Sequence, residues 1–215
     1  MFQLYVFDLD GTLIDSRRDL ANATNALLVE YGAAPLPEAS IGRMVGDGAA
    51  TLVARAFEAS GIARPADALE RFLAVYEAQL LNHTRPYPGI PAALDALGAR
   101  ASLAVLTNKP IGSTRQILDG LQLASHFSAD AVIGGDGPLP RKPDPAGLRH
   151  LMARAGATIE TTLLVGDSVI DWRTARAAST RVCLVRYGFG FDGVSMADLG
   201  PDDRVIDAPA DLLRM

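Results

Sequence analysis

Residues 4–13 read LYVFDLDGTL, an apolar run that ends in two aspartates, Asp8 and Asp10, followed by Gly-Thr. The run predicts a buried β-strand, in which residues i and i+2 lie on the same side. Both carboxylates would then project near the carboxyl end of the strand, where open α/β sheets bind ligands. Crowded carboxylates repel each other unless a cation lies between them, so the stretch indicates a divalent metal site. One aspartate can also act as a nucleophile, and the competing interpretation is a simple turn.

The composition limits the class of protein. The chain has 215 residues, a formal net charge of −5 and one cysteine, Cys183. This length allows one α/β domain with an insertion, or two small domains. The acidic balance argues against nucleic acid as a partner, and a lone cysteine in an apolar run indicates a core residue in a reducing compartment. The N-terminus does not resemble a signal peptide and no apolar stretch is long enough to span a membrane, so we expect a cytoplasmic protein without membrane partners.

Short apolar runs recur along the chain and predict the strands of one sheet. They are residues Leu4–Leu9, Leu103–Leu106, Ala131–Ile133, Leu163–Val165, Val182–Val185 and, more weakly, Val205–Ile206. Continuous apolar runs, rather than alternation, are typical of strands buried on both faces of a parallel sheet. Segments of helical character lie between them, so we expect an α/β fold with a doubly wound, Rossmann-like core.

Residues 16–84 interrupt this alternation because they show helical periodicity and no convincing strand. The helical segments are residues 19–31, 49–60 and 65–81. We therefore expect a helical cap at residues 16–84, inserted into a catalytic core of residues 1–15 and 85–215, with hinges near residues 15–17 and 83–88. Such a cap can close over a site at the strand ends and exclude water. The alternative is that these helices simply pack on one face of the sheet.

Polar residues also follow the second predicted strand and a later turn. Thr107 and Asn108 combine side-chain donors with the backbone N–H groups of a helix start, a set that suits phosphate oxygens. Read alone, the same pair is also a common helix cap. Lys142 precedes a proline in the stretch RKPDP at residues 141–145, where a point charge would balance a phosphate and a carboxylate. A solvated loop lysine is the alternative.

The fourth predicted strand ends at GDSVID, residues 166–171, which places Asp167 after the strand and Asp171 one helical turn later. Mg²⁺ prefers oxygen ligands, so Asp167 is a suitable third ligand beside the Asp8 carboxylate and the backbone carbonyl of Asp10. Asp171 would then orient Lys142 or a metal-bound water. The alternative is that Asp167 caps the helix and Asp171 is solvated in its first turn.

The four motifs occur in the order DxDGT, TNK, KP and GDSxxD, and in this order the chain resembles the haloacid-dehalogenase superfamily of phosphotransferases. Within it, the chain is most similar to the bacterial phosphoglycolate phosphatase group. The supporting stretches are Ile41–Gly48, Tyr87–Gly89, Val132–Asp136, Tyr187–Gly190 and Val205–Asp207. Two departures are Ser179, where Ala-Gly is usual after the fourth motif's helix, and Trp172.

The resemblance implies a mechanism and a set of site residues. Asp8 would attack phosphorus and form an aspartyl-phosphate, while Asp10 protonates the leaving alkoxide and later activates water. A Mg²⁺ ion would be held by Asp8, Asp10 and Asp167. The remaining implied residues fall into a phosphate-binding group and a group that supports the ligands. They are Thr107, Asn108 and Lys142 in the first group, and Asp171, Ser168 and Thr12 in the second.

The implied substrate is 2-phosphoglycolate, which would yield glycolate and phosphate. Its carboxylate needs a partner, and Arg43 in the cap is a candidate bidentate donor. Backbone N–H groups around Gly46 and Gly48 are a second option, and a solvated arginine is the alternative for Arg43. Other readings are a phosphatase of sugar phosphates, nucleotides or pyrophosphate, a sugar-phosphate mutase, and, from another class, a binding module without catalysis. We expect a small phosphorylated metabolite as the partner and a monomer or homodimer.

Overall fold

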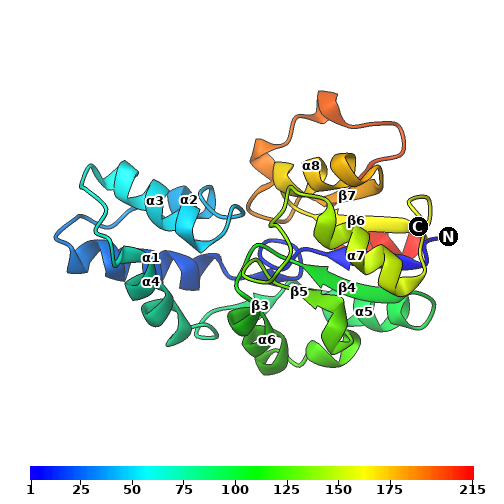
Figure 1. Ribbon diagram of the computed structural model, residues 1–215, viewed down its shortest axis with the longest axis horizontal. Helices are drawn as coiled ribbons and strands as arrows, with labels where there is room; N and C mark the ends of the chain where they lie inside the picture. The colour runs from blue at the N-terminus through cyan, green and yellow to red at the C-terminus, as the bar shows by residue number, and fades with distance from the viewer.

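The computed structural model describes all 215 residues and contains one six-stranded parallel sheet (Figure 1). The strands are β1 (Leu4–Phe7), β4 (Ser102–Leu106), β5 (Val132–Ile133), β6 (Thr162–Gly166), β7 (Arg181–Val185) and β8 (Arg204–Ile206). Their spatial order is β5-β4-β1-β6-β7-β8, and every neighbouring pair is parallel. The predicted α/β fold with a parallel sheet is confirmed, and all six predicted strands are present.

Helices cover both faces of the sheet (Figure 1). They are α5 (Ile90–Gly98), α6 (Ile111–Gly120), α7 (Ala146–Ala155) and α8 (Val169–Ala178). In β1, Tyr5 and Phe7 belong to a buried cluster with residues of α5 and α6, whereas Leu4 and Val6 belong to a second cluster with residues of α7 and α8. Successive strand residues point to opposite faces, so a run that is apolar throughout is buried on both.

The register of the central strands brings their carboxyl ends level. Phe7 at the end of β1 lies opposite Val105 of β4 and Val165 of β6. The residues that follow these three positions therefore emerge at the same edge of the sheet. This edge receives the chain segments that contain all four predicted motifs.

Residues 17–77 form four helices that lie together beside the sheet, at the left of Figure 1; we call them the helical lobe. They are α1 (Arg17–Glu30), α2 (Glu38–Gly42), α3 (Ala49–Ser60) and α4 (Ala68–Glu77). Two short strands, β2 (Ile14–Asp15) and β3 (Arg85–Pro86), pair antiparallel where the chain enters and leaves the lobe. The lobe is therefore joined to the core by two chain segments, β2 and β3, that lie side by side.

A buried carboxylate reinforces this connection. Asp19 in α1 is fully buried and accepts hydrogen bonds from the backbone N–H groups of His83 (2.8 Å) and Thr84 (2.7 Å) and from the Thr84 hydroxyl (2.8 Å). These donors lie 64 and 65 residues further along the chain. A buried carboxylate is stable only when it is hydrogen-bonded. Asp19 therefore joins the segment that enters the lobe to the segment that leaves it.

The lobe also differs in detail from the prediction. Helix α2 was not expected. Helix α4 is shorter than the predicted segment 65–81 because a turn precedes Ala68 and residues 78–81 form turns after Glu77. Five short 3-10 helices complete the chain, at Ala124–His126, Ala129–Ala131, Phe191–Gly193, Met196–Asp198 and Pro209–Arg214. None of the helices combines the length and the apolar character needed to cross a membrane.

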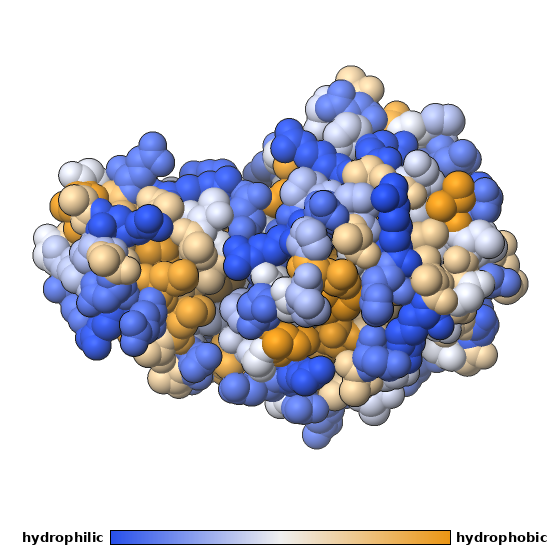
Figure 2. Space-filling model, viewed as in Figure 1, coloured by the Kyte–Doolittle hydropathy of each residue, from blue (hydrophilic) through white to orange (hydrophobic).

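The surface is mixed in character. Figure 2 shows mostly hydrophilic residues on this face, with apolar patches on the helical lobe and on the middle of the core. The outline is indented between the two parts (Figure 2).

Candidate active site

Asp8 lies directly after β1 and has one oxygen held and one free. Its Oδ1 accepts a hydrogen bond from the Leu9 N–H (2.7 Å) and forms an ion pair with Lys142 Nζ (2.9 Å). Its Oδ2 accepts no hydrogen bond from the protein, and Asp8 lines a pocket between the sheet edge and the helical lobe. Burial raises the pKa of Asp8 to about 6, against the opposing charge of Lys142. The carboxylate is thus fixed in orientation through one oxygen, while the other has no protein partner.

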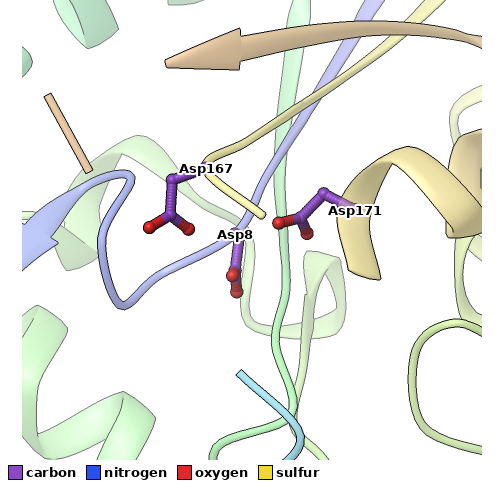
Figure 3. A group of neighbouring side chains, drawn as sticks. All are labelled: Asp8, Asp167 and Asp171. Atoms are coloured by element: carbon purple, nitrogen blue, oxygen red, sulfur yellow. The ribbon is translucent and has the colours of Figure 1, made fainter. Parts of the chain in front are cut away.

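Asp167 follows β6 and lies close to Asp8, as Figure 3 shows. Its Oδ2 accepts a hydrogen bond from the Gly190 N–H (2.8 Å), a residue in the loop after β7. Gly11 makes room for this side chain, because a Cβ at residue 11 would lie 2.0 Å from Asp167 Oδ2 and Gly11 has a φ of +85°. Burial, with the negative charges of Asp171 and Asp8, raises the pKa of Asp167 well above its ordinary value.

Asp171 lies in the first turn of α8 and orients the lysine predicted to balance phosphate. Its Oδ1 accepts from Lys142 Nζ (2.6 Å), and its Oδ2 accepts from the backbone N–H and the hydroxyl of Ser168 (3.1 and 2.7 Å). The pair Ser168 and Asp171 forms a capping box, so the helix start and the lysine are held by one carboxylate. Lys142 Nζ is therefore fixed between Asp8 and Asp171.

Asp10 is paired with a second lysine that the sequence interpretation did not single out. Lys109 Nζ lies 3.0 Å from both carboxylate oxygens of Asp10, and the Ser16 hydroxyl donates to Oδ1 (2.5 Å). Lys109 also donates to the Tyr76 hydroxyl of α4 (2.7 Å), with Nζ 4.5 Å from the ring centre. Burial opposes the charged form of Lys109, but the negative charge of Asp10 and the hydrogen bond to Tyr76 outweigh it and raise the pKa of Lys109 above its ordinary value.

The predicted phosphate donors, Thr107 and Asn108, lie at the same edge of the sheet but differ in how many of their hydrogen-bonding groups already have partners. Thr107 is buried, lines the pocket and accepts from the Lys109 N–H through Oγ1 (3.2 Å). Asn108 also lines the pocket, but its amide nitrogen already donates to the carbonyls of Gly46 and Lys142, each at 2.9 Å. The Asn108 side chain therefore joins the lobe to the core, and its Oδ1 is buried without a partner.

Only some of the cap residues predicted for substrate specificity lie at the pocket. Gly46 and Gly48 line the pocket, whereas Arg43 does not. Arg43 is exposed and its guanidinium donates to the Ser40 hydroxyl at 3.2 Å. Thr12 is fully buried beside the site, and its hydroxyl has no hydrogen-bond partner. The structure thus brings the core residues and the two glycines together but leaves Arg43 on the surface.

Four residues of the site, Ser16, Tyr76, Lys109 and Gly190, were missed from sequence. Lys109 stands inside the TNK motif, so its place after a strand was a usable signal. Tyr76 and Gly190 reach the site only through the fold: Tyr76 comes from the lobe, and Gly190 contacts Asp167 from 23 residues away. No spacing in the sequence links them to the aspartates.

The donor set suits a hard divalent cation. Oxygens of Asp8, Asp167 and Asp171 lie within 4.8 Å of one another, and all three residues are buried. Both oxygens of Asp171 already accept hydrogen bonds, which leaves Asp8 Oδ2 and Asp167 Oδ1 as unpaired carboxylate oxygens. Burial and the negative charges of Asp171 and Asp8 raise the pKa of Asp167, and a cation at this place would offset both effects. Mg²⁺ takes one or two carboxylates with further oxygen ligands.

Known proteins share this sequence and fold. Residues 5–185 match the family described as haloacid dehalogenase-like hydrolase. The chain is 46% identical over 199 residues to a phosphoglycolate phosphatase from Rhodospirillum rubrum, which covers 88% of this chain and 82% of the relative. A phosphoglycolate phosphatase from Cereibacter sphaeroides is 43% identical over 189 residues, 86% of this chain and 85% of the relative.

The fold of this chain is also similar to that of solved structures. A solved structure described as a predicted phosphoglycolate phosphatase from Haemophilus somnus superposes with a TM-score of 0.91 at 32% identity. The match covers 99% of this chain and 97% of that one. With the four motifs gathered at one sheet edge and a family match over most of its length, the chain belongs to the haloacid dehalogenase-like hydrolase family.

Proposed function

We propose that this chain is a Mg²⁺-dependent phosphatase that hydrolyses 2-phosphoglycolate to glycolate and phosphate through an aspartyl-phosphate on Asp8. The observation that carries the proposal is the state of Asp8: Oδ1 is held by Leu9 and Lys142, and Oδ2 is free at the pocket. An oriented carboxylate beside a fixed cation is suited to nucleophilic attack on a phosphoester.

The proposed reaction has two steps. In the first, Asp8 Oδ2 forms a bond to phosphorus as the bond to the ester oxygen breaks, and Asp10 gives a proton to the departing alkoxide. In the second, water attacks the same phosphorus and gives a proton to Asp10, which frees phosphate and restores Asp8. Asp10 lines the same pocket as Asp8, as this double role requires.

The positive groups would stabilise charge on the transferring phosphoryl group. Lys142 is fixed between Asp8 and Asp171, and Thr107 lines the pocket that Asp8 also lines. Catalysis of phosphoryl transfer is mostly positioning and electrostatic stabilisation, so groups held in advance are effective. Mg²⁺, held by Asp8, Asp167 and the Asp10 carbonyl, would supply further positive charge to the phosphate oxygens.

We also propose that the helical lobe acts as a cap. Its residues Val45, Leu52, Phe72 and Leu73 form the apolar side of the pocket that faces Asp8 and Asp10. An apolar wall excludes water from a reacting phosphoester and strengthens the electrostatic interactions inside. The lobe is tied to the core by the β2–β3 pair, by Asp19 and by Asn108.

The choice of substrate follows the names of the relatives, and kinetics will test it. Phosphate release with Mg²⁺ should be measured for 2-phosphoglycolate, sugar phosphates, nucleotides and pyrophosphate, and compared as kcat/KM. We expect the highest value for 2-phosphoglycolate. A higher value for another phosphoester would overturn the substrate but keep the reaction. A requirement for a bisphosphate activator, without steady phosphate release, would instead identify a sugar-phosphate mutase.

A further inference from the structure

The carboxylate of 2-phosphoglycolate needs a partner, and this inference rests on the proposed function. The substrate carries two anionic groups separated by one carbon and the ester oxygen. When its phosphorus lies at Asp8, its carboxylate must lie nearby in the same pocket. That region already contains the negative charge of Asp10, so a second carboxylate there requires a cation.

The pocket offers one such cation. Among the 15 residues that line it, Lys109 alone carries a positive charge. Lys142 Nζ lies between Asp8 and Asp171. Arg43 is exposed and bonded to Ser40, and Arg141 is exposed with its Nε donating to the Gly135 carbonyl.

Lys109 has three N–H donors, and all three have partners in this structure, so a ligand carboxylate would take the place of one Asp10 oxygen. Its Nζ faces the two oxygens of Asp10 at 3.0 Å on one side and the hydroxyl of Tyr76 at 2.7 Å on the other. The surrounding pocket wall is apolar, with Leu20 and Phe72 among its residues. A buried ammonium in such a wall strengthens any hydrogen bond that it makes to an anion.

Tyr76 adds a second donor from the lobe. Its hydroxyl oxygen accepts the hydrogen bond from Lys109, and the hydroxyl donates none within the protein. A phenolic group can donate and accept at once, so its proton is available to a ligand in the pocket. The ammonium and the hydroxyl are adjacent, as a carboxylate with two oxygens requires.

We propose that Lys109 and Tyr76 together bind the carboxylate of the substrate. Lys109 comes from the loop after β4 and Tyr76 from α4, so recognition is divided between the core and the helical lobe. This assignment replaces Arg43 as the specificity residue.

The test compares two substrates that differ only in the carboxylate. Ethyl phosphate has the two-carbon chain of 2-phosphoglycolate with a methyl group in place of the carboxylate. The readout is the ratio of kcat/KM for 2-phosphoglycolate to kcat/KM for ethyl phosphate, measured with Mg²⁺ by phosphate release. A ratio removes losses that affect both substrates, including those that follow when Asp10 loses its lysine partner.

We expect the ratio to fall by roughly tenfold in Tyr76→Phe and on the order of a hundredfold in Lys109→Met, as loss of charge-assisted hydrogen bonds predicts. Tyr76→Phe keeps the ring and its packing, so it decides the matter if Lys109→Met does not fold. The matched control is Tyr31→Phe, which removes another hydroxyl of the lobe, one that bonds Asp67 outside the pocket. Its ratio should equal that of the unmodified protein.

Two failures are distinguishable. If the unmodified protein hydrolyses 2-phosphoglycolate and Tyr76→Phe keeps its ratio, the carboxylate site is overturned while the proposed function stands. If the unmodified protein does not release phosphate from 2-phosphoglycolate, the proposed substrate fails and the carboxylate site fails with it.

Discussion

The carboxyl edge of the sheet and the helical lobe face the same pocket, but they contribute different chemistry to it. The sheet edge contributes buried charges: Asp8, the most exposed of the three buried aspartates at the site, is 6% exposed. The lobe contributes mainly apolar side chains, such as Leu52 and Phe72, and the single hydroxyl of Tyr76.

This difference has a physical cause. A buried carboxylate is stable only when it is paired or hydrogen-bonded, and the ends of neighbouring strands bring partners together with little freedom. Apolar contacts are not directional. A lobe that presents an apolar wall can therefore be joined to the core by few chain segments, and its separation from the core costs less free energy. Reactive groups are therefore expected on the core, and selection of the substrate on the boundary between core and lobe.

The largest effect is expected at the core. Asp8→Asn should lower kcat by about 10⁴-fold or more, the scale seen when a nucleophile is removed, because the amide cannot form the phosphoenzyme. Phosphate release and mass spectrometry of the trapped phosphoenzyme provide the measurement. Asp95→Asn is the control, since that side chain is 75% exposed on α5, and it should retain full turnover. Turnover in Asp8→Asn close to that of the control would contradict the nucleophile assignment.

The connection between the two regions comes next. Asp19→Ala leaves the buried N–H and hydroxyl of Thr84, and the part-buried N–H of His83, without their acceptor, so we expect a loss of about 3 kcal/mol in the free energy of unfolding. Urea denaturation measures it. Asp67→Ala, which removes only an exposed partner of Tyr31, should change stability by no more than about 0.5 kcal/mol. Equal losses in the two variants would mean that Asp19 does not tie the lobe to the core.

Two glycine variants distinguish a loss of activity at the site from a loss of stability through backbone strain. Gly11→Ala should lower kcat/KM by about 10–100-fold, the range found when the support of a metal ligand is disturbed, because its Cβ meets Asp167. Gly32 in the lobe has a similar φ of +79° with nothing within 4 Å of an added Cβ. Gly32→Ala should therefore cost about 1–2 kcal/mol of stability from strain alone and leave kcat/KM intact. A similar loss of activity in both variants would contradict the role of close packing at Asp167.

The smallest effect concerns the sheet interior. Cys183 of β7 is fully buried, and burial raises the pKa of its thiol to about 12. The thiolate is the reactive form, so a thiol reagent at mildly alkaline pH should label the protein only after denaturation. Labelling is followed by mass spectrometry with and without denaturant. Rapid labelling of the native protein would show that the sheet opens far more readily than its packing indicates.

The strands were predictable because each is apolar along its whole length. Continuous burial leaves a local signature, and the predicted ends differ from the observed ends by no more than two residues, as in β1, which ends at Phe7 rather than Leu9. Helix α2 was not predictable in the same way. It has five residues, Glu38–Gly42, too few for helical periodicity to appear.

The site was predictable where the motifs follow strands and unpredictable elsewhere. Asp8, Asp167 and Lys142 stand beside strand or helix ends, and the structure brings them together. The roles assigned to them, and the division into core and cap, stay predictions. Arg43 was predicted as a cation in the cap, and neither residue type nor position in the chain determines whether a side chain after a helix end faces the pocket.

The amino-acid sequence by itself determined the sheet, the longer helices and the aspartates and Lys142 at the sheet edge, because burial and turn formation act over short stretches of chain. Only the tertiary structure decided which groups meet across the pocket: Lys109 with Asp10 and Tyr76, Gly190 with Asp167, and Asp19 with Thr84. These contacts join residues far apart in the chain, and their partners are set by packing between elements, for which no local pattern exists.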